Sequence, residues 1–361
     1  MAIARFLLIA CGTLIFSALA LSPRLQFQHD APVAPQLAAS QPRGPYTYHG
    51  CRVYSSDDWF TTNLVAGGSS YATNTVDPRS ANIIANLSAT FPGLYLNEAN
   101  PGHETTVNLA TNATPTHAVS GTRMLSSARS SQGNTIPVTT PFYEEGSAYG
   151  GCRGDCHAIV LNTDTCVDYE TYLFGSRQWD GASYNTGYGS IYDLKKSLNS
   201  QYAEHVGITA AGLPLLGMTD FGEDASAASI DHIVDFSLPG SGAAPNASGG
   251  YVAPAAVGHT CKTNCANKLP LGARLRLRSS YSCPSRDDYP QAHLVCVQLK
   301  TYGMLFADWN GSYGPGTSII QLRFGTTTTG ANPWDGRGDL YPGLKDIKIG
   351  DFDVMTLGEI R

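Results

Sequence analysis

The sequence predicts a mainly β fold: one β-sandwich or jelly-roll-like domain with a few short helices, stabilised by disulfides. Only 14% of the residues are charged, whereas the chain has 38 glycines and 19 tyrosines. Short alternating or β-branched runs recur, and Gly, Pro, Asn or Asp separates most of them. Such a pattern is typical of many short strands joined by turns.

The elements follow from the periodicity of the apolar residues. Strands are expected at Thr106–Leu109, Thr135–Thr140, His157–Leu161, Val167–Leu173, Ile230–Leu238, Ala273–Ser279, Met304–Ala307 and Ile319–Phe324. Helices are expected at Pro78–Leu87, near Ile191–Leu198 and at Gln291–Tyr302. Strands therefore outnumber helices in the predicted domain.

The N-terminal segment has the layout of a secretory signal peptide, residues 1–20. Arg5 precedes an apolar run, and Ala18-Leu19-Ala20 gives a cleavage pattern. The apolar run stops before Pro23 and is short for a bilayer-spanning helix, which needs roughly 20 residues. A lipoprotein site at Cys11 is an alternative. Residues 21–46 read as a Pro- and Ala-rich tether, and residues 47–361 as the β-rich domain.

Of nine cysteines, Cys11 lies in the signal peptide, which leaves eight. An even number after an export signal predicts disulfides in an oxidising compartment, with the pairing left open. The two C-x3-C pairs could instead hold zinc, but exposed thiolates compete poorly with oxidation in a secreted chain. The eight cysteines are Cys51, Cys152, Cys156, Cys166, Cys261, Cys265, Cys283 and Cys296.

The net charge of the chain and the absence of familiar sequence motifs argue against several classes of function. The net charge of -6 and the absence of a Lys/Arg cluster argue against nucleic-acid binding. The chain has no G-x-S-x-G, H-E-x-x-H, P-loop, G-x-G-x-x-G or EF-hand motif. N-glycosylation sequons, which fit exposed loops of a secreted glycoprotein, stand at Asn86, Asn112, Asn246 and Asn310.

The segment GGCRGDCH contains the first candidate site. Asp155 and His157 are two apart and project from one side of an extended strand. If the following hairpin turns symmetrically about Thr163-Asp164, His157 faces Glu170. A carboxylate–imidazole group of this kind moves protons near neutral pH, although a satisfied polar patch is the alternative.

The same segment spells Arg153-Gly154-Asp155, an integrin-binding tripeptide. A short motif of this kind arises readily by chance in a chain of this length. We therefore expect no integrin binding.

Further candidates lie along the rest of the chain. His232 is a candidate functional histidine. It shares its side of the strand with apolar residues, so a half-buried core histidine is the alternative interpretation. Glu223 and His259 fall in loops, where functional residues concentrate. Arg274, Arg276 and Arg278 alternate on one strand face and could hold carboxylates or sulfates, with a solvated strand face as the alternative.

Aromatic residues cluster among glycines further along the chain. They could form a sugar-stacking wall or belong to the core, and they are Trp179, Tyr184, Tyr188 and Tyr192.

Several motifs taken together resemble a family of uncharacterised proteins exported by bacteria. The resemblance covers about residues 141–361. It is carried by Gly154-Asp155-x-His157, Ile230-Asp231-His232, Arg274-Leu275-Arg276-Leu277 and Lys300-Thr301-Tyr302-Gly303-Met304 with Ala307-Asp308. In similar chains Asp308 runs directly into Asn-Gly, whereas Trp309 intervenes here. The resemblance makes the RGD spelling incidental and adds Asp308 to the candidates.

These residues predict a secreted, extracellular glycan-active enzyme, a polysaccharide hydrolase or lyase, working in a β-sandwich cleft. The expected catalytic residues are Asp155, His157, Glu170, Glu223 and His232. The expected substrate-binding residues are His259, Arg276, Trp179, Tyr188 and Asp308.

For a hydrolase, Glu170 and Glu223 are the first candidates for the two carboxylates. For a lyase, His157 or His232 is the base and Arg276 neutralises a uronate. No cofactor is expected, although the His and Asp residues could hold a divalent metal.

Two other classes stay open. One is a non-catalytic polysaccharide-binding or adhesion protein, and the other is a secreted carboxylate peptidase. Convergence of at least two carboxylates and a histidine in space favours an enzyme over a binding module.

Overall fold

The structure is a computed structural model, and its described residues belong to one compact unit, residues 39–361. None of the helices in this described part has the length and apolarity that crossing a bilayer requires. The described residues are 46–53, 58–65, 68–69, 72–90, 96–97, 105–120, 135–146, 152, 155–173, 177–197, 201, 207–239, 248–258, 261, 265–310, 320–334 and 340–360. The predicted signal peptide and nearly all of the predicted tether lie outside them.

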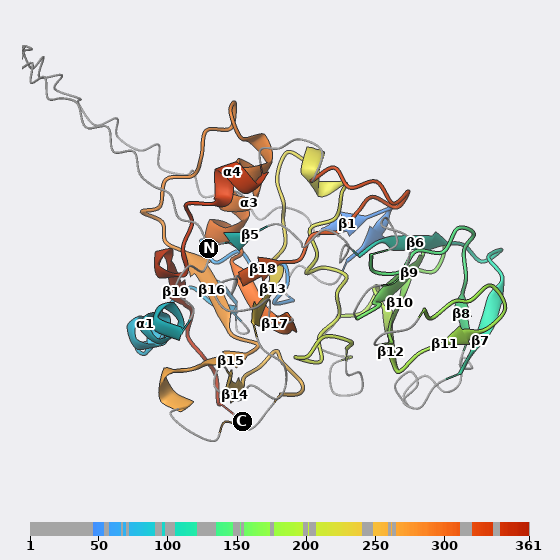
Figure 1. The fold of residues 1–361 in the computed structure, drawn as a ribbon, viewed down its shortest axis with the longest axis horizontal. Coiled ribbons are helices and arrows are strands. Elements are labelled where there is room, and N and C mark those ends of the chain that lie inside the picture. The colour runs from blue at the N-terminus through green and yellow to red at the C-terminus, as the bar shows by residue number, and fades with distance from the viewer. Residues whose placement is uncertain are drawn as a thin grey trace, which may run out of the picture. The chain divides into compact units, whose positions relative to one another are not determined.

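The largest sheet has six strands in the order β19-β16-β17-β13-β18-β5 (Figure 1). Its parallel β13–β17 pair lies at the centre, and β16 and β18 flank this pair in antiparallel pairing. The strands are β5 (Leu96–Asn97), β13 (Val234–Pro239), β16 (Arg274–Leu277), β17 (Met304–Asn310), β18 (Ile320–Leu322) and β19 (Phe352–Val354). This sheet contributes half of the candidate site.

A four-stranded sheet, in the order β12-β10-β9-β6, contributes the other half. A three-stranded sheet, β11-β7-β8, lies beside it (Figure 1). The strands are β6 (Val107–Ala110), β7 (Thr116–Ser120), β8 (Thr135–Pro137), β9 (Ala158–Asn162), β10 (Val167–Tyr172), β11 (Tyr184–Asn185) and β12 (Tyr188–Asp193).

Short ribbons and helices complete the described part. Helix α1 packs against β19, and α3 packs against β16 and α4. The ribbons are β1 (Thr47–Tyr48) with β2 (Cys51–Arg52), β3 (Gly68–Ser69) with β4 (Ala72–Thr73), and β14 (Ser248–Tyr251) with β15 (Leu269–Leu271). The helices are α1 (Ser80–Thr90), α3 (Pro290–Thr301) and α4 (Leu340–Leu344), with 3-10 turns η3 (Asp224–Ser226), η4 (Cys265–Asn267) and η5 (Ile349–Asp351).

The mainly β, disulfide-bonded fold with few helices is confirmed. Each predicted strand overlaps an observed one, and the helices predicted at Pro78–Leu87 and Gln291–Tyr302 correspond to α1 and α3. The helix predicted near Ile191–Leu198 is wrong, because Tyr188–Asp193 pairs with β10 along its whole length. Pairing with a neighbouring strand overrides the local pattern there.

One hydrophobic core joins the two main sheets. It contains Ile159 and Leu161 from β9 as well as Phe236 and Phe306 from the centre of the six-stranded sheet. The two phenylalanine rings stack with centroids 5.5 Å apart. This shared core fixes the two sheets against each other, and the polar site lies where the core ends.

All eight cysteines form disulfides, as predicted. The pairs are Cys51–Cys166, Cys152–Cys156, Cys261–Cys265 and Cys283–Cys296. Both C-x3-C pairs are therefore disulfides rather than zinc ligands.

The sequons do not all lie in loops. Asn112 stands in an exposed turn, but Asn86 lies within α1 and Asn310 ends β17, which corrects the expectation for both. Asn246 lies outside the described residues.

The register predicted for the β9–β10 hairpin is wrong by two residues. Glu170 faces Ile159, not His157. Asn162 Oδ1 accepts hydrogen bonds from the backbone N–H groups of Asp164 and Thr165, so the turn begins later than expected. A shift of two preserves the strand face, and His157 and Glu170 stay diagonal neighbours on it.

A β-bulge precedes Asp308 on β17. Phe236 pairs with Phe306, but the next residue, Ser237, pairs with Asp308, so Ala307 is the extra residue. The bulge turns Asp308 onto the face that also carries Leu305. Trp309 packs its ring edge-on against Phe306, with centroids 4.9 Å apart.

Candidate functional site

A histidine–carboxylate pair stands at the start of β9. His157 Nδ1 lies 2.5 Å from Glu145 Oε2, and the His157 backbone N–H donates to the same oxygen at 3.1 Å. Both side chains are buried, with His157 only 1% exposed. Burial alone would lower the pKa of His157, but the Glu145 carboxylate outweighs it and the pKa is raised. The Glu145 carboxylate therefore favours the charged form of the imidazole.

A second charged group lies on the six-stranded sheet. Arg323 Nε donates to Asp235 Oδ2 and Arg323 Nη2 to Asp308 Oδ2, each at 2.9 Å. Asp308 Oδ1 also accepts from the backbone N–H groups of Ala210 and Trp309. Burial raises the pKa of Asp235 to about 6 against the opposing effect of Arg323. The pKa of Arg323 is raised, because these carboxylates outweigh its burial.

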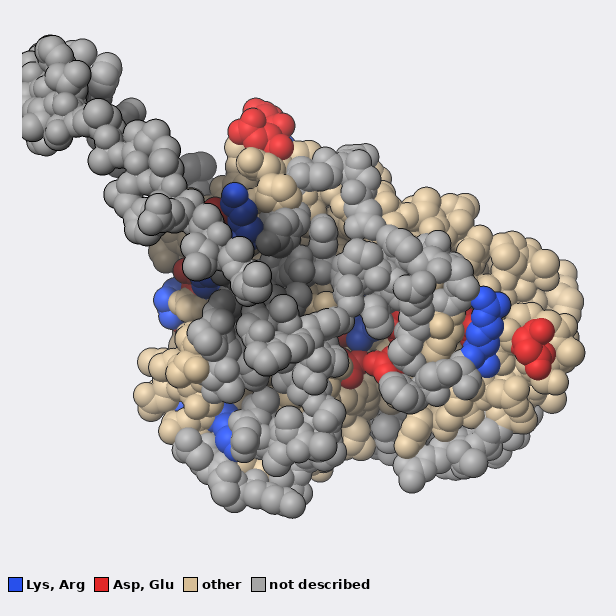
Figure 2. Space-filling view, viewed as in Figure 1, with Lys and Arg blue, Asp and Glu red and all other residues tan. Residues whose placement is uncertain are grey.

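Asp155 connects the two groups. Burial raises the pKa of this half-buried carboxyl, and the negative charges of Glu145 and Asp308 add to the effect, while His157 and Arg323 oppose it. Asp155 is thus within electrostatic range of both the β9 pair and the Arg323 group. Figure 2 shows acidic and basic side chains meeting near the centre of the displayed face, between the regions of the two main sheets in Figure 1.

Two tyrosines lead from this site to the surface. The Tyr172 ring lies 5.1 Å from the His157 ring, and the Tyr188 ring lies 6.0 Å from that of Tyr172. Tyr188 is 44% exposed. The pKa of Tyr172 is raised, first by burial and then by Asp155 and Asp308. The face of an aromatic ring can pack against the C–H side of a pyranose ring, so the two tyrosines are candidate sugar contacts.

Glu170 is held by the backbone of a neighbouring loop. Its carboxyl is fully buried and accepts hydrogen bonds from the backbone N–H groups of Leu215 and Leu216 at 2.7 Å. Asp168, also fully buried, stands two residues away on the same side of β10. Burial and the mutual repulsion of the two carboxyls raise the pKa of Asp168, and burial raises that of Glu170. Glu170 therefore anchors the 213–216 loop.

Glu223 and His232 belong to a different cluster. His232 is fully buried, with Nε2 3.9 Å from Asp220 and 3.7 Å from Asp224. Burial lowers the pKa of His232, but these carboxylates outweigh it and raise it to about 9. Glu223 accepts from the Tyr48 hydroxyl at 3.0 Å.

Two further predicted residues, Arg276 and Trp179, do not join the Asp155 site. Arg276 on β16 follows Leu275, which pairs with Met304, so it lies about 17 Å along the sheet from Asp308. Trp179 packs in a small separate core, 4.6 Å from the His117 ring. His259, Arg153 and Gly154 lie outside the described residues. Within the described part, no group of three or more His, Cys, Asp or Glu side chains is placed to hold a metal ion.

Of the predicted set, the structure brings together Asp155, His157, Asp308 and, at the margin, Tyr188. Sequence reasoning missed Glu145, Asp235, Arg323 and Tyr172. Only Asp235 carried a usable signal, because a charged residue interrupts an otherwise apolar strand centre there. Around His157 the structure shows one carboxylate in contact, Glu145, with Asp155 and Asp308 in electrostatic range, whereas Asp220 and Asp224 lie 3.9 Å and 3.7 Å from His232.

No protein-family model, curated protein or solved structure matches the chain. The resemblance to an exported bacterial family therefore stays a prediction, and the functional argument rests on the site itself.

Proposed function

We propose that this protein is a secreted polysaccharide hydrolase in which Asp155 is the general acid and Asp308 is the base or nucleophile. The observation that carries the proposal is the environment of the two carboxyls. The raised pKa of Asp155 favours its protonated form, while Asp308 is ion-paired with Arg323 and accepts two backbone hydrogen bonds. Two carboxyl groups in contrasting surroundings are what hydrolysis of a glycosidic bond requires.

The other residues act on these two. His157 is fixed by Glu145, which favours its charged form, and a charged His157 moderates the raised pKa of Asp155. Arg323 donates a hydrogen bond to Asp308 and another to Asp235. The bond to Asp235 fixes the guanidinium, which in turn holds Asp308 in position. Neither His157 nor Arg323 touches the substrate in this scheme, so both are positioning residues.

The hydrolase is favoured over the lyase. A lyase needs a neutral base, whereas the Glu145 carboxylate favours the protonated imidazole of His157. It also needs a cation to neutralise the uronate, but the charge of Arg323 is already balanced by two carboxylates and Arg276 is far along the sheet.

Asp155→Asn tests the proposed acid. We expect release of reducing ends from a panel of neutral, uronic and sulfated polysaccharides to fall at least about 100-fold, the usual contribution of general acid catalysis. Asp353→Asn, which removes a surface carboxylate paired with Arg278, is the matched control and should retain activity. Ultraviolet-absorbing unsaturated products would instead identify a lyase. Retention of polymer in gel shifts without turnover would identify a binding module.

Tyr188→Ala tests the proposed sugar-contacting surface. Loss of one aromatic contact should raise KM by about 3- to 10-fold with little change in kcat or in the thermal midpoint. Tyr289→Ala removes another exposed tyrosine, 36% exposed against 44% for Tyr188, and should leave KM unchanged. An equal KM in both variants contradicts this role for Tyr188.

A further inference from the structure

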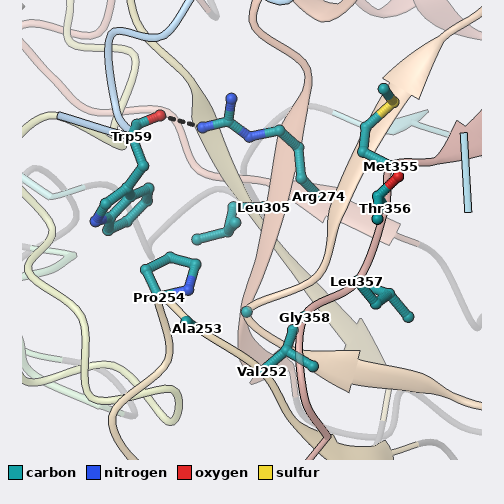
Figure 3. A pocket seen from close by; sticks show the side chains of 11 residues that line it. Trp59, Val252, Ala253, Pro254, Arg274, Leu305, Met355, Thr356, Leu357 and Gly358 are labelled. Carbon is teal, nitrogen blue, oxygen red and sulfur yellow. Dashed lines mark hydrogen bonds between the residues drawn. The ribbon is translucent and has the colours of Figure 1, made fainter. Parts of the chain in front are cut away.

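A small pocket is lined by residues of the β16–β17 part of the six-stranded sheet and by the chain after β19 (Figure 3). Trp59, Leu305 and Met355 form its buried apolar floor, and Ala253 and Thr356 belong to its exposed rim. The cavity measures about 30 Å³, against the 10–15 Å³ or so that one water molecule needs on this measure. It has room for one small polar group.

The unusual residue of this pocket is Arg274. Its side chain extends from β16 toward Trp59 and donates to the carbonyl oxygens of Trp59 and, at 3.4 Å, Thr62 (Figure 3). Arg274 is only 7% exposed. Among the described residues, no carboxylate forms an ion pair with it, and burial lowers its pKa to about 9.

The contrast with Arg323 shows what Arg274 lacks. Arg323 meets two carboxylates on the same sheet, whereas Arg274 meets only carbonyl groups. A buried guanidinium stays charged, and an uncompensated buried charge is costly. Carbonyl oxygens carry only partial negative charge. The N–H donors of the Arg274 guanidinium therefore have no anionic partner among the described residues.

We propose that this pocket binds the carboxylate group of a small ligand, with Arg274 as its ion-pair partner. A carboxylate matches the planar fork of the guanidinium, and the apolar floor suits the carbon atoms attached to it. Two sources share this chemistry: a free monocarboxylate, and a uronate unit of a polymer.

The second source is compatible with the sheet geometry. Arg274 pairs with Leu305 and Leu305 with Asp235, so all three side chains share one face. Two strand spacings, about 10 Å, separate Arg274 from Asp235. The proposal does not depend on the hydrolase activity, because it is tested by binding alone.

The test is calorimetric titration of the mature protein with propionate and with glucuronate, at constant ionic strength. Chloride and neutral propionamide are the comparison ligands. We expect saturable 1:1 binding of at least one carboxylate and none of propionamide. Binding of propionate but not of glucuronate would indicate that the pocket takes free monocarboxylates. Binding of glucuronate would indicate that it takes uronate units. Equal binding of chloride, or no binding of either carboxylate, overturns the proposal.

Two variants check the site. Arg274→Gln should weaken carboxylate binding at least 10-fold. Because that variant removes a buried side chain, Leu357→Glu serves as a second one: it adds a carboxylate to the half-buried wall of the pocket. It should abolish carboxylate binding and raise the thermal midpoint of the ligand-free protein. Unchanged binding in Leu357→Glu contradicts the proposed location.

Discussion

Arg323→Met is expected to lower the free energy of unfolding by about 3–5 kcal/mol and to abolish turnover. The side chain of Arg323 is 13% exposed and those of Asp235 and Asp308 are 1% and 11% exposed, so its loss leaves two carboxylates poorly hydrated and without their cation. Asp308 then loses the contact that orients it for catalysis. Equilibrium denaturation and reducing-end release measure the two effects separately.

Arg278→Met is the matched control for this prediction. Arg278 also makes an ion pair, with Asp353 at 3.0 Å, but its side chain is 43% exposed. A surface pair of this kind contributes about 0–1 kcal/mol. If the two variants lose similar stability, Arg323 is not the buried counter-ion that the structure shows. Adding Asp235→Asn to Arg323→Met should recover part of the lost stability, because it removes one of the two carboxylates that Arg323→Met leaves without a cation.

The protein is expected to be more stable at mildly acidic pH than at pH 8, by roughly 2–4 kcal/mol. Burial raises the pKa of Asp220 to about 7 and that of Asp235 to about 6, and it also raises the pKa values of Asp168 and Glu170. The folded state therefore holds these protons more tightly than the unfolded chain. Their stabilising contribution is complete below about pH 4 and is lost as pH rises through about 6–7.

His232 acts in the same direction at higher pH. Its folded pKa of about 9 exceeds the ordinary value of 6.5, so its contribution is complete below pH 6.5 and is lost as pH rises through 9. Urea midpoints measured from pH 5 to pH 9 check the trend. Asp220→Asn and Asp168→Asn should each flatten the curve between pH 5 and pH 8, whereas Asp353→Asn should not. A midpoint that rises over this interval contradicts the assignment.

The sequence predicted which residues contribute to the site better than it predicted their geometry. Asp155 and His157 do contribute, but the extended strand expected to carry both is wrong, because Asp155 lies in a turn, Cys156 has a positive φ of 53° and β9 begins at Ala158. The pairing of His157 with Glu170 failed because the Asn162 side chain delays the turn, and Cys166 adopts a positive φ of 53° at its end. Register depends on such turn details rather than on the apolar pattern.

Contacts between side chains from different segments of the chain could not be predicted in this way. Glu145 precedes His157 by 12 residues, and Arg323 lies 88 residues from Asp235 and 15 from Asp308. No pattern within a strand specifies which distant carboxylate a given arginine meets. The alternating arginines Arg274, Arg276 and Arg278, of which the first two lie in β16, show the opposite outcome. Their alternation was correct, but Arg274 is buried and Arg278 pairs with Asp353, so they do not act as one surface.

The Cys51–Cys166 disulfide determines how the domain bears mechanical load. Tension applied at Tyr46 reaches Cys51 after five residues and crosses to the β9–β10 turn, 115 residues further along the chain. Under oxidising conditions the pull therefore acts on a hairpin paired on both sides within the four-stranded sheet, and only the two-residue β1–β2 ribbon is free to peel away. Reduction of this disulfide reroutes the same force along the backbone after Cys51, so it changes the order in which the domain comes apart.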